Sequence, residues 1–482
     1  MELRSYQKEQ LNFLKSLKNR KVLQSPTGTG KSIVLLEYIK EVRDDYNTIV
    51  LSTGFNNLVF QMFSDAKEII GDEDLQMIIG SNHLIPNTDG RIIYSETVGD
   101  SCAGCDKSKC SKCAKDAVYN YLLRRKKIVI TNHSYLISHL NTINPDLIIL
   151  DEAHTFPEFY RSSMQTEISG VFFDEIRRYM SLNNPMSFTF CKTYKTGCPD
   201  RIIPVVFDDI IKNAKTAFSK AEILELKREF KSVFTESKNT LFVEDESSFR
   251  RYNYFNRIRL ESRGKTPDIV LSSATIDKYT MKMFGINKHE VYVQKLPDDR
   301  YANSKFISCH YDYRNKIKEV FQDEFVGKKG LILCTSNASV DYTVKELDGI
   351  TEITRDLSTF AKMKTGVLVG SKALFQGINI RDLEFVILDK LPFDIYDKNF
   401  QTYCKFIKNT AKIDPWTEYT VPLMENSLLQ ALGRLWRKND IENNIYDDGT
   451  ICIFDPRLGG KMNFVEKFVC SCKPNIQFEV KE

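Results

Sequence analysis

The sequence predicts an α/β protein in which two parallel-sheet domains follow each other along the chain. Short apolar runs recur between segments of helical periodicity, such as 32–43 and 427–438. Runs this short and this apolar are typical of strands buried on both faces of a parallel sheet, and strands that alternate with helices form right-handed crossover units. The runs fall into two sets, which indicates two sheets: 21–24, 48–52, 127–131, 146–150 and 268–271, then 330–335, 366–369, 384–388 and 450–454.

Length and composition agree with a globular chain of several domains. At about 150 residues per domain, 482 residues suggest roughly three domains. Hydrophobic residues make up 42% and charged residues 27%, which leaves ample material for buried cores. The net charge of +4 is too small to identify a partner. The first residues are polar and no apolar run approaches the length of a membrane span, so we expect a cytoplasmic protein without a membrane partner.

Two segments interrupt the alternation and are predicted insertions into the first domain. The segment 84–126 contains four closely spaced cysteines, and 160–262 is charged and largely helical by periodicity. Tyr252, Tyr254 and Phe255 suit either stacking on nucleic-acid bases or packing against helices. The predicted boundaries are 1–83, 127–159 and 263–302 for the first domain, 84–126 and 160–262 for its insertions, and 303–482 for the second domain.

A glycine-rich loop between a predicted strand and a predicted helix indicates a phosphate site. Its residues are Ser25-Pro26-Thr27-Gly28-Thr29-Gly30-Lys31-Ser32, and this context is the one that a P-loop requires. Glycines let backbone N–H groups turn toward phosphate oxygens, and the helix N-terminus adds partial positive charge. We expect Thr27 to Gly30 to surround the phosphates of ATP, Lys31 to contact the β- and γ-phosphates, and Ser32 to bind Mg²⁺. A glycine-rich turn without a ligand is the alternative.

Two adjacent carboxylates follow another predicted strand. The run 146–150 is apolar and continues into Asp151-Glu152-Ala153-His154. Ligands bind at the carboxyl ends of strands in an open α/β sheet. Asp151 is therefore expected to hold Mg²⁺, and Glu152 to act as the general base that polarises the attacking water. His154 is a candidate for coupling this site to the second domain. A solvated strand end is the alternative for the pair.

With these two motifs, the chain resembles the superfamily 2 helicases. The segment Leu271-Ser272-Ser273-Ala274-Thr275 is similar to their motif III, and Gln430-Ala431-Leu432-Gly433-Arg434-Leu435-Trp436-Arg437 is similar to their motif VI. The resemblance implies two RecA-like domains, with Gln430, Arg434 and Arg437 acting at the γ-phosphate. Arginines three apart lie on one helix face, and their planar guanidinium groups bind phosphate in a fixed geometry.

The resemblance narrows to the XPD/DinG group of this superfamily. Gln7 is placed like the group's adenine-side glutamine, and Asn132-His133-Ser134-Tyr135-Leu136 resembles its N-H-x-x-L segment. Leu391-Pro392-Phe393, Asp448-Gly449 and Asp455-Pro456-Arg457 resemble its later elements. Phe375-Gln376-Gly377-Ile378-Asn379 resembles motif V, which implies that Gly377 lies at the nucleotide. Two acids that are usual in motif V are replaced here by Gln376 and Asn379.

The four cysteines of the first insertion predict a metal centre. Cys102, Cys105, Cys110 and Cys113 have the spacing C-x2-C-x4-C-x2-C, which by itself allows zinc or an iron–sulfur cluster. The XPD/DinG group carries a 4Fe–4S domain between its P-loop and its DEAH box, so the resemblance implies a 4Fe–4S cluster, with zinc as the alternative. Four lysines are interleaved with the cysteines and suit a phosphate backbone.

These observations predict an ATP-dependent DNA helicase. We expect a monomer that moves along single-stranded DNA and unwinds duplex at junctions, with 5′→3′ polarity implied by the resemblance alone. An RNA helicase and a translocase that does not unwind are the alternatives that use the same ATP site. A nucleic-acid-binding protein with a decayed motor is a third alternative, against which the intact Lys31, Glu152, Arg434 and Arg437 argue.

Overall fold

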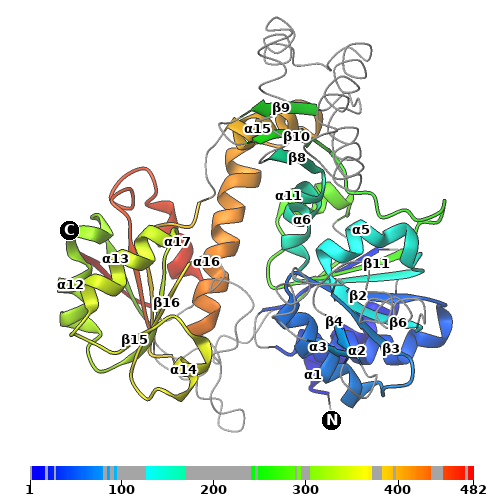
Figure 1. Cartoon of the computed structure of the whole chain (residues 1–482), viewed down its shortest axis with the longest axis horizontal. Coiled ribbons are helices and arrows are strands. Elements are labelled where there is room, and N and C mark those ends of the chain that lie inside the picture. The colour runs from blue at the N-terminus through cyan, green and yellow to red at the C-terminus, as the bar shows by residue number, and fades with distance from the viewer. Residues whose placement is uncertain are drawn as a thin grey trace, which may run out of the picture.

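The structure of this chain is a computed structural model. It describes residues 3–16, 20–26, 29–79, 84–86, 92–94, 126–169, 240–244, 248–287, 290–294, 304–371, 383–393, 398–435, 449–472 and 476–481. Figure 1 shows two α/β lobes with a long helix standing between them. Among the helices in these ranges, none combines the length and the apolar character that a membrane crossing needs.

The first lobe is built on a seven-stranded parallel sheet with the order β12-β1-β11-β7-β2-β6-β3. All five runs predicted for the first set lie in this sheet, where most of their side chains are buried. The carboxyl ends of β1, β11 and β7 are therefore neighbours. The strands are β1 (Arg20–Gln24), β2 (Ile49–Thr53), β3 (Leu75–Ile78), β6 (Ile128–Asn132), β7 (Leu147–Asp151), β11 (Asp268–Ser273) and β12 (Val291–Val293).

Helices cover both faces of this sheet and bury separate cores. One face carries α1 (Ser5–Ser16), α2 (Lys31–Val42) and α3 (Asn56–Ile69), whose apolar residues pack on inward-facing strand residues such as Leu51. The other face carries α5 (His133–Ile143), the short 3-10 turn Ala153–Thr155, α6 (Phe156–Ser163) and α11 (Lys278–Phe284). This arrangement holds the ends of the central strands rigidly between two packed layers.

The second lobe repeats the architecture with the sheet order β15-β16-β14-β17-β18-β13-β19, again all parallel. Its strands are β13 (Ser304–Cys309), β14 (Lys329–Leu333), β15 (Ile353–Thr354), β16 (Gly366–Gly370), β17 (Phe385–Leu388), β18 (Thr450–Phe454) and β19 (Ile476–Lys481). One face carries α12 (Tyr313–Glu324) and α13 (Asn337–Leu347), and the other carries α14 (Leu357–Lys362), α16 (Val421–Leu435) and α17 (Phe464–Ser471). Two parallel sheets in tandem confirm the predicted fold class.

The second insertion differs from the prediction where it is described. After α6, its described residues form β8 (Gln165–Ser169), β9 (Thr240–Glu244) and β10 (Ser248–Asn253), an antiparallel sheet with the order β8-β10-β9. The expectation of a largely helical segment is wrong for these residues. Tyr252 and Tyr254 are buried in the core of the first lobe, so they pack internally and do not offer a surface for base stacking. The stretch 170–239 lies outside the described residues.

The hairpin β4 (Leu84–Pro86) and β5 (Ile92–Tyr94) is the described part of the first insertion apart from Lys126. Cys102, Cys105, Cys110 and Cys113 lie outside the described residues. The domain boundaries stay predictions, although β12 belongs to the first sheet and β13 to the second.

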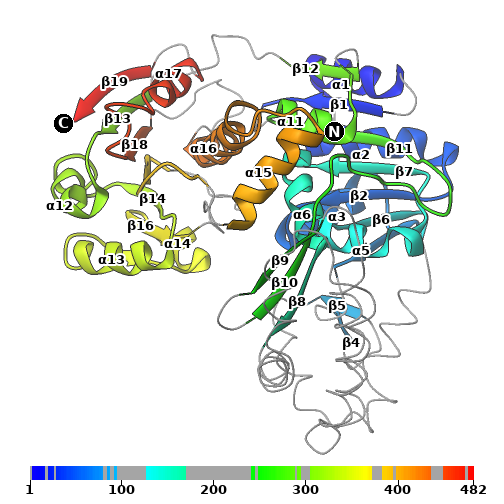
Figure 2. The same ribbon diagram turned by 90° about the horizontal axis from the view of Figure 1, so that it is seen from above.

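A segment of the second half of the chain packs on the first lobe. Between β17 and β18 the chain forms α15 (Lys398–Thr410), a π-helical turn (Trp416–Thr420) and α16. The Tyr254 hydroxyl donates to Asn399 Oδ1 (3.2 Å), and the Tyr279 and Tyr403 hydroxyls are 2.6 Å apart. Figure 2 shows α15 and α16 between the two sheets. The two lobes are therefore joined by buried side chains as well as by the chain itself.

Candidate nucleotide site between the two lobes

The site is formed where three neighbouring strands of the first sheet end. The glycine-rich loop follows β1, Asp151 ends β7, and Ser272 and Ser273 end β11. The register places Ser272 beside Asp151 and Ser273 beside Gln24, and the Ser25 N–H continues the ladder to the Ser273 carbonyl at 3.0 Å. Three segments that are far apart in the sequence therefore meet at one edge, because parallel strands end on the same side of the sheet.

The side chain of Lys31 lies against the glycine-rich loop. Its buried ammonium donates to the carbonyl oxygens of Ser25 (2.9 Å) and Pro26 (3.2 Å). Ser25, where the P-loop pattern usually has glycine, shares a hydrogen bond with the Thr29 hydroxyl (2.8 Å) and accepts one from Gln10 Nε2 (3.1 Å). The serine thus ties the loop to α1, so the departure from the pattern has a structural role.

Gln7 on α1 contacts the same loop. Its Nε2 donates to the Thr29 carbonyl (3.0 Å), and its Oε1 accepts from the Arg4 backbone N–H (3.0 Å). Gly30 has φ +77°, and a Cβ at this position would lie 2.6 Å from Gln7 Nε2. Glycine is therefore favoured at 30 by the left-handed backbone, and any side chain there would displace the Gln7 amide. Ser32 lies in the first turn of α2, directly after Lys31.

Asp151 and Glu152 supply two carboxylates at the end of β7. Asp151 is 7% exposed and accepts a hydrogen bond from the Ser272 hydroxyl (3.1 Å). Burial and the neighbouring charge of Glu152 raise the pKa of Asp151 to about 6, against the opposing effect of Lys31. Glu152 has φ +51°, a left-handed backbone that is rare outside glycine and is held by its surroundings. Carboxylate and hydroxyl oxygens beside a lysine are the donor set that a Mg²⁺–nucleotide complex prefers, so Asp151 and Ser32 fit this role.

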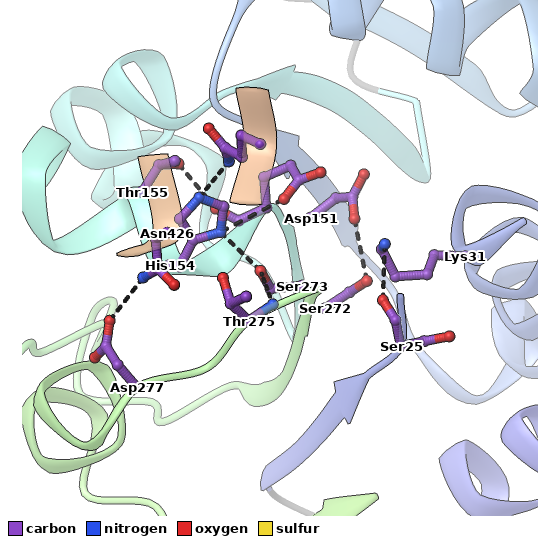
Figure 3. Close-up of polar contacts among 12 residues, drawn as sticks. Ser25, Lys31, Asp151, His154, Thr155, Ser272, Ser273, Thr275, Asp277 and Asn426 are labelled. Carbon is purple, nitrogen blue, oxygen red and sulfur yellow. Dashed lines mark hydrogen bonds and ion pairs between the residues drawn. The ribbon is translucent and has the colours of Figure 1, made fainter. Parts of the chain in front are cut away.

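His154 joins this edge to the second lobe. Its Nδ1 is 2.7 Å from the Ser273 hydroxyl, and its Nε2 is 2.5 Å from Gln430 Nε2 on α16 (Figure 3). Burial lowers the pKa of His154 to about 4, so the ring is neutral near pH 7. A neutral ring donates from Nδ1 to Ser273 and accepts at Nε2 from the Gln430 amide. The strand-end carboxylates, the β11 serines and α16 are therefore connected by hydrogen bonds.

Comparisons with known proteins agree with this arrangement. A family model for the helicase C-terminal domain matches residues 306–475, and a model for the res subunit of type III restriction enzymes matches residues 1–183. Residues 306–475 therefore form a helicase C-terminal domain, and the chain is similar to the superfamily 2 helicases of the XPD/DinG type.

Solved structures share the fold of this chain. A structure titled XPD helicase has a TM-score of 0.64 at 14% identity, and the alignment covers 99% of this chain and 100% of that one. The structure of Xpd4 from S. tokodaii has a TM-score of 0.58 at 14% identity and covers 98% and 100%. The ATP-dependent DNA helicase YoaA of Haemophilus influenzae is 28% identical over 174 residues, which are 33% of this chain and 26% of YoaA. The match thus spans about a quarter of that relative's length.

The structure brings together most of the residues expected at the helicase nucleotide site. Gln7, Thr29, Gly30, Lys31, Ser32, Asp151 and Glu152 lie on the first lobe around one edge, and Gln430 reaches it from α16. The backbone of Arg434 lies in α16, whereas its side chain, and all of Thr27, Gly28, Gly377 and Arg437, lie outside the described residues. Their roles stay predictions.

Several residues of this edge were not singled out by the sequence analysis. Ser272 and Ser273 belong to the segment that resembles motif III, and no individual role was expected of either. Ser272 forms a hydrogen bond with Asp151, and Ser273 forms one with His154. Asp277 and Asn426 bond to each other across the lobes at 3.0 Å. Asp277 could have been identified from the sequence as the residue that caps the N-terminus of α11. Asn426 lies inside a helix, where an asparagine has no comparable sequence signal.

Asp151→Asn should stabilise the nucleotide-free protein at pH 7. The folded pKa of Asp151 is about 6, above its ordinary value of 3.8, so folding disfavours the charged form. The cost is absent below about pH 4, grows as the pH rises through 6, and is complete above it, where it amounts to about 1–3 kcal/mol. Thermal unfolding in EDTA should show a higher midpoint for Asp151→Asn at pH 7 and a smaller gain at pH 4.5. An equal gain at both pH values would contradict the electrostatic cause.

Proposed function

We propose that this chain is an ATP-dependent DNA helicase that moves along single-stranded DNA. The observation that carries the proposal is the hydrogen-bonded contact of His154 with Gln430, because it sets the Q-x-x-G-R helix of the second lobe against the edge that holds Lys31 and Asp151. A site shared by two lobes can convert nucleotide hydrolysis into movement of one lobe against the other. The name of the relative YoaA favours DNA over RNA.

The chemical step is the attack of water on the γ-phosphate of ATP. Glu152 accepts a proton as the water oxygen bonds to phosphorus, and the bond from phosphorus to the β–γ bridging oxygen breaks, so that ADP leaves. Lys31 balances charge on the β- and γ-phosphates, and Arg434 and Arg437 balance the charge that develops in the transition state. Mg²⁺ bound by Ser32 and Asp151 would neutralise further phosphate charge when present.

An aromatic stack between Phe393 of the second lobe and the exposed Trp416 of the segment 398–420 suits single-stranded nucleic acid. Trp416, 45% exposed, stacks on Phe393 with ring centroids 5.8 Å apart and an interplanar angle of 13°. The Arg457 guanidinium lies 5.2 Å from the Phe393 ring centroid and is held by Asp455 at 2.6 and 2.8 Å. Aromatic rings and guanidinium planes bind bases without reading their sequence, as a motor requires. We propose this stack as a nucleic-acid contact.

ATP turnover and strand displacement test the proposal. Wild-type protein should hydrolyse ATP faster with single-stranded DNA than without it, and Lys31→Ala should lose turnover while the fold is retained. Duplexes with 5′ or 3′ tails should separate only with the 5′ tail, a polarity that rests on family resemblance. Stimulation by RNA alone would favour an RNA helicase, and turnover without strand separation would favour a translocase. If no ATP turnover is detected under any of these conditions, the proposal of an ATP-driven motor is wrong.

We also propose a 4Fe–4S cluster on Cys102, Cys105, Cys110 and Cys113. Protein purified without oxygen should carry about four iron atoms per chain, and Cys105→Ser should lose them together with strand separation. ATP binding should survive, because the P-loop belongs to a lobe with its own core. Elemental analysis and nucleotide titration measure the two effects. One zinc per chain and no iron would overturn the iron–sulfur assignment and leave the helicase proposal intact.

A further inference from the structure

The long helix α16 presents two different faces to the two lobes. Its apolar residues pack on the second sheet: Met424, Leu428, Ala431, Leu432 and Leu435. On a helix with 3.6 residues per turn, positions 426 and 430 fall roughly opposite this apolar face, and position 434, four residues further along, continues the same stripe toward its flank. The apolar face fixes α16 to its own lobe, so the other stripe is the part of α16 that can contact the first lobe.

Two amide side chains of this stripe bond to the first lobe. Asn426, which is 6% exposed, donates from Nδ2 to Asp277 Oδ2 at 3.0 Å, one helical turn before the contact of Gln430 with His154 (Figure 3). The other oxygen of Asp277, Oδ1, accepts from the Thr280 backbone N–H at 2.6 Å and caps α11. Both oxygens of Asp277 are therefore used, one within its own lobe and one across the interface.

The two contacts hold both ends of one short segment. The segment 273–277 begins at Ser273, which bonds to His154, and ends at Asp277, which bonds to Asn426. The Thr275 N–H donates to the Ser273 hydroxyl at 3.2 Å, so the segment is also stabilised by a hydrogen bond of its own. Two attachment points four residues apart on a helix restrict its rotation and its sliding against the first lobe more than the Gln430 contact alone.

We propose that Asp277 and Asn426 are positioning residues for ATP hydrolysis: their hydrogen bond sets the register of α16 so that Arg434, the next position on the same stripe, reaches the γ-phosphate. The inference rests on the proposed function and assigns a role to two residues that touch neither nucleotide nor metal. A displacement of about 1 Å in a group that stabilises a transition state is enough to cost about 100-fold in rate. The effect of losing this contact therefore belongs to turnover and not to ATP affinity.

Because the Asn426 amide donates to the Asp277 carboxylate, the amide and the carboxylate can be exchanged between the two positions. Asn426→Asp places a second carboxylate against Asp277 in a buried setting, so kcat should fall about tenfold or more while KM for ATP changes by less than about threefold. In Asp277→Asn/Asn426→Asp, the amide introduced at position 277 still caps α11 through its oxygen and donates its N–H to the carboxylate introduced at position 426. The double variant should recover to within about threefold of wild type, and Asp277→Asn alone should be mild because the Asn426 amide can turn over to present its oxygen.

Asn409→Asp provides the matched control. It makes the same chemical change on the exposed side of α15 and should leave turnover unchanged. Hydrogen exchange gives a readout that needs no activity: amides of 421–435 should exchange faster in Asn426→Asp and return to the wild-type rate in the double variant. Unlike loss of the helix cap, this change should leave the amides of α11 protected in both variants.

Wild-type kcat in Asn426→Asp, or a double variant no better than Asn426→Asp, would overturn the inference. An increase in KM with unchanged kcat would also overturn it, because the contact would then serve nucleotide binding. Absence of ATP turnover in the wild-type protein would instead remove the proposed function and with it the positioning role, and hydrogen exchange would still report whether the two side chains hold the helix.

Discussion

Glu152→Gln should bind ATP and single-stranded DNA with near wild-type affinity and hydrolyse ATP about 10²–10⁴ times more slowly. The amide keeps the size of the side chain and cannot accept the proton of the attacking water. Glu152 lies directly after Asp151, and its carboxylate is 3.5 Å from His154 Nδ1, which places the group at the edge where the phosphates are expected. Steady-state turnover and equilibrium binding of a fluorescent ATP analogue measure the two effects separately.

Glu319→Gln serves as the control for this variant. It makes the same change on the exposed face of α12 in the second lobe and should turn over ATP at the wild-type rate. Turnover of Glu152→Gln close to that of the control would show that the water is activated by another group. A loss of ATP affinity in place of turnover would assign Glu152 to binding.

Arg434→Ala should lower kcat by about 10³ with a much smaller change in ATP affinity, as expected for an arginine that stabilises charge only in the transition state. Its backbone lies on the stripe of α16 that contacts His154 and Asp277 through Gln430 and Asn426. Arg434→Lys should recover little activity, because an ammonium lacks the planar fork that binds phosphate oxygens. Arg437→Ala should act in the same direction.

Arg355→Ala is the matched control for the arginine variants. Arg355 forms an exposed ion pair with Asp341 in the second lobe, and its loss should change stability and turnover little. Weaker ATP binding in Arg434→Ala at unchanged kcat would make this arginine a ground-state contact. Such a result would also contradict the proposal that the position of α16 matters for the transition state of hydrolysis.

The chemistry-bearing ends of the first sheet could be read from the sequence because they depend on local patterns. Apolar runs of four or five residues predicted β1, β7 and β11 within about two residues of their observed ends, and the polar residues that follow each run lie at the carboxyl end of its strand. The same reasoning located Lys31, Asp151 and Glu152 at one edge. Each of these predictions depends only on a strand, its direction and the residues that follow it.

Strands with weaker local signals were not predicted. The edge strand β19 alternates apolar and polar residues over Ile476–Lys481, and β12 has only three residues, so neither contains an apolar run of four or more residues. The inner strand β13 contains Ser304 and Ser308, which are buried, and Ser308 is bonded to Glu466 on α17. From the sequence alone a serine is expected at the surface, unless a hydrogen-bond partner for it in the interior is known. The partner of Ser308 lies more than 150 residues away in the chain.

The sequence by itself determined the fold class and the succession of the two sheets along the chain, and it predicted which residues bind phosphate and Mg²⁺, since each of these inferences rests on neighbours in the chain. Only the tertiary structure decided that Tyr252 and Tyr254 are core residues, that 398–420 packs on the first lobe, and that Asn426 bonds to Asp277. The physical reason is that these contacts join segments separated by more than a hundred residues. A side chain such as Asn426 has the same local pattern whether its amide faces water or a buried carboxylate, so the partner, and not the sequence around it, fixes its role.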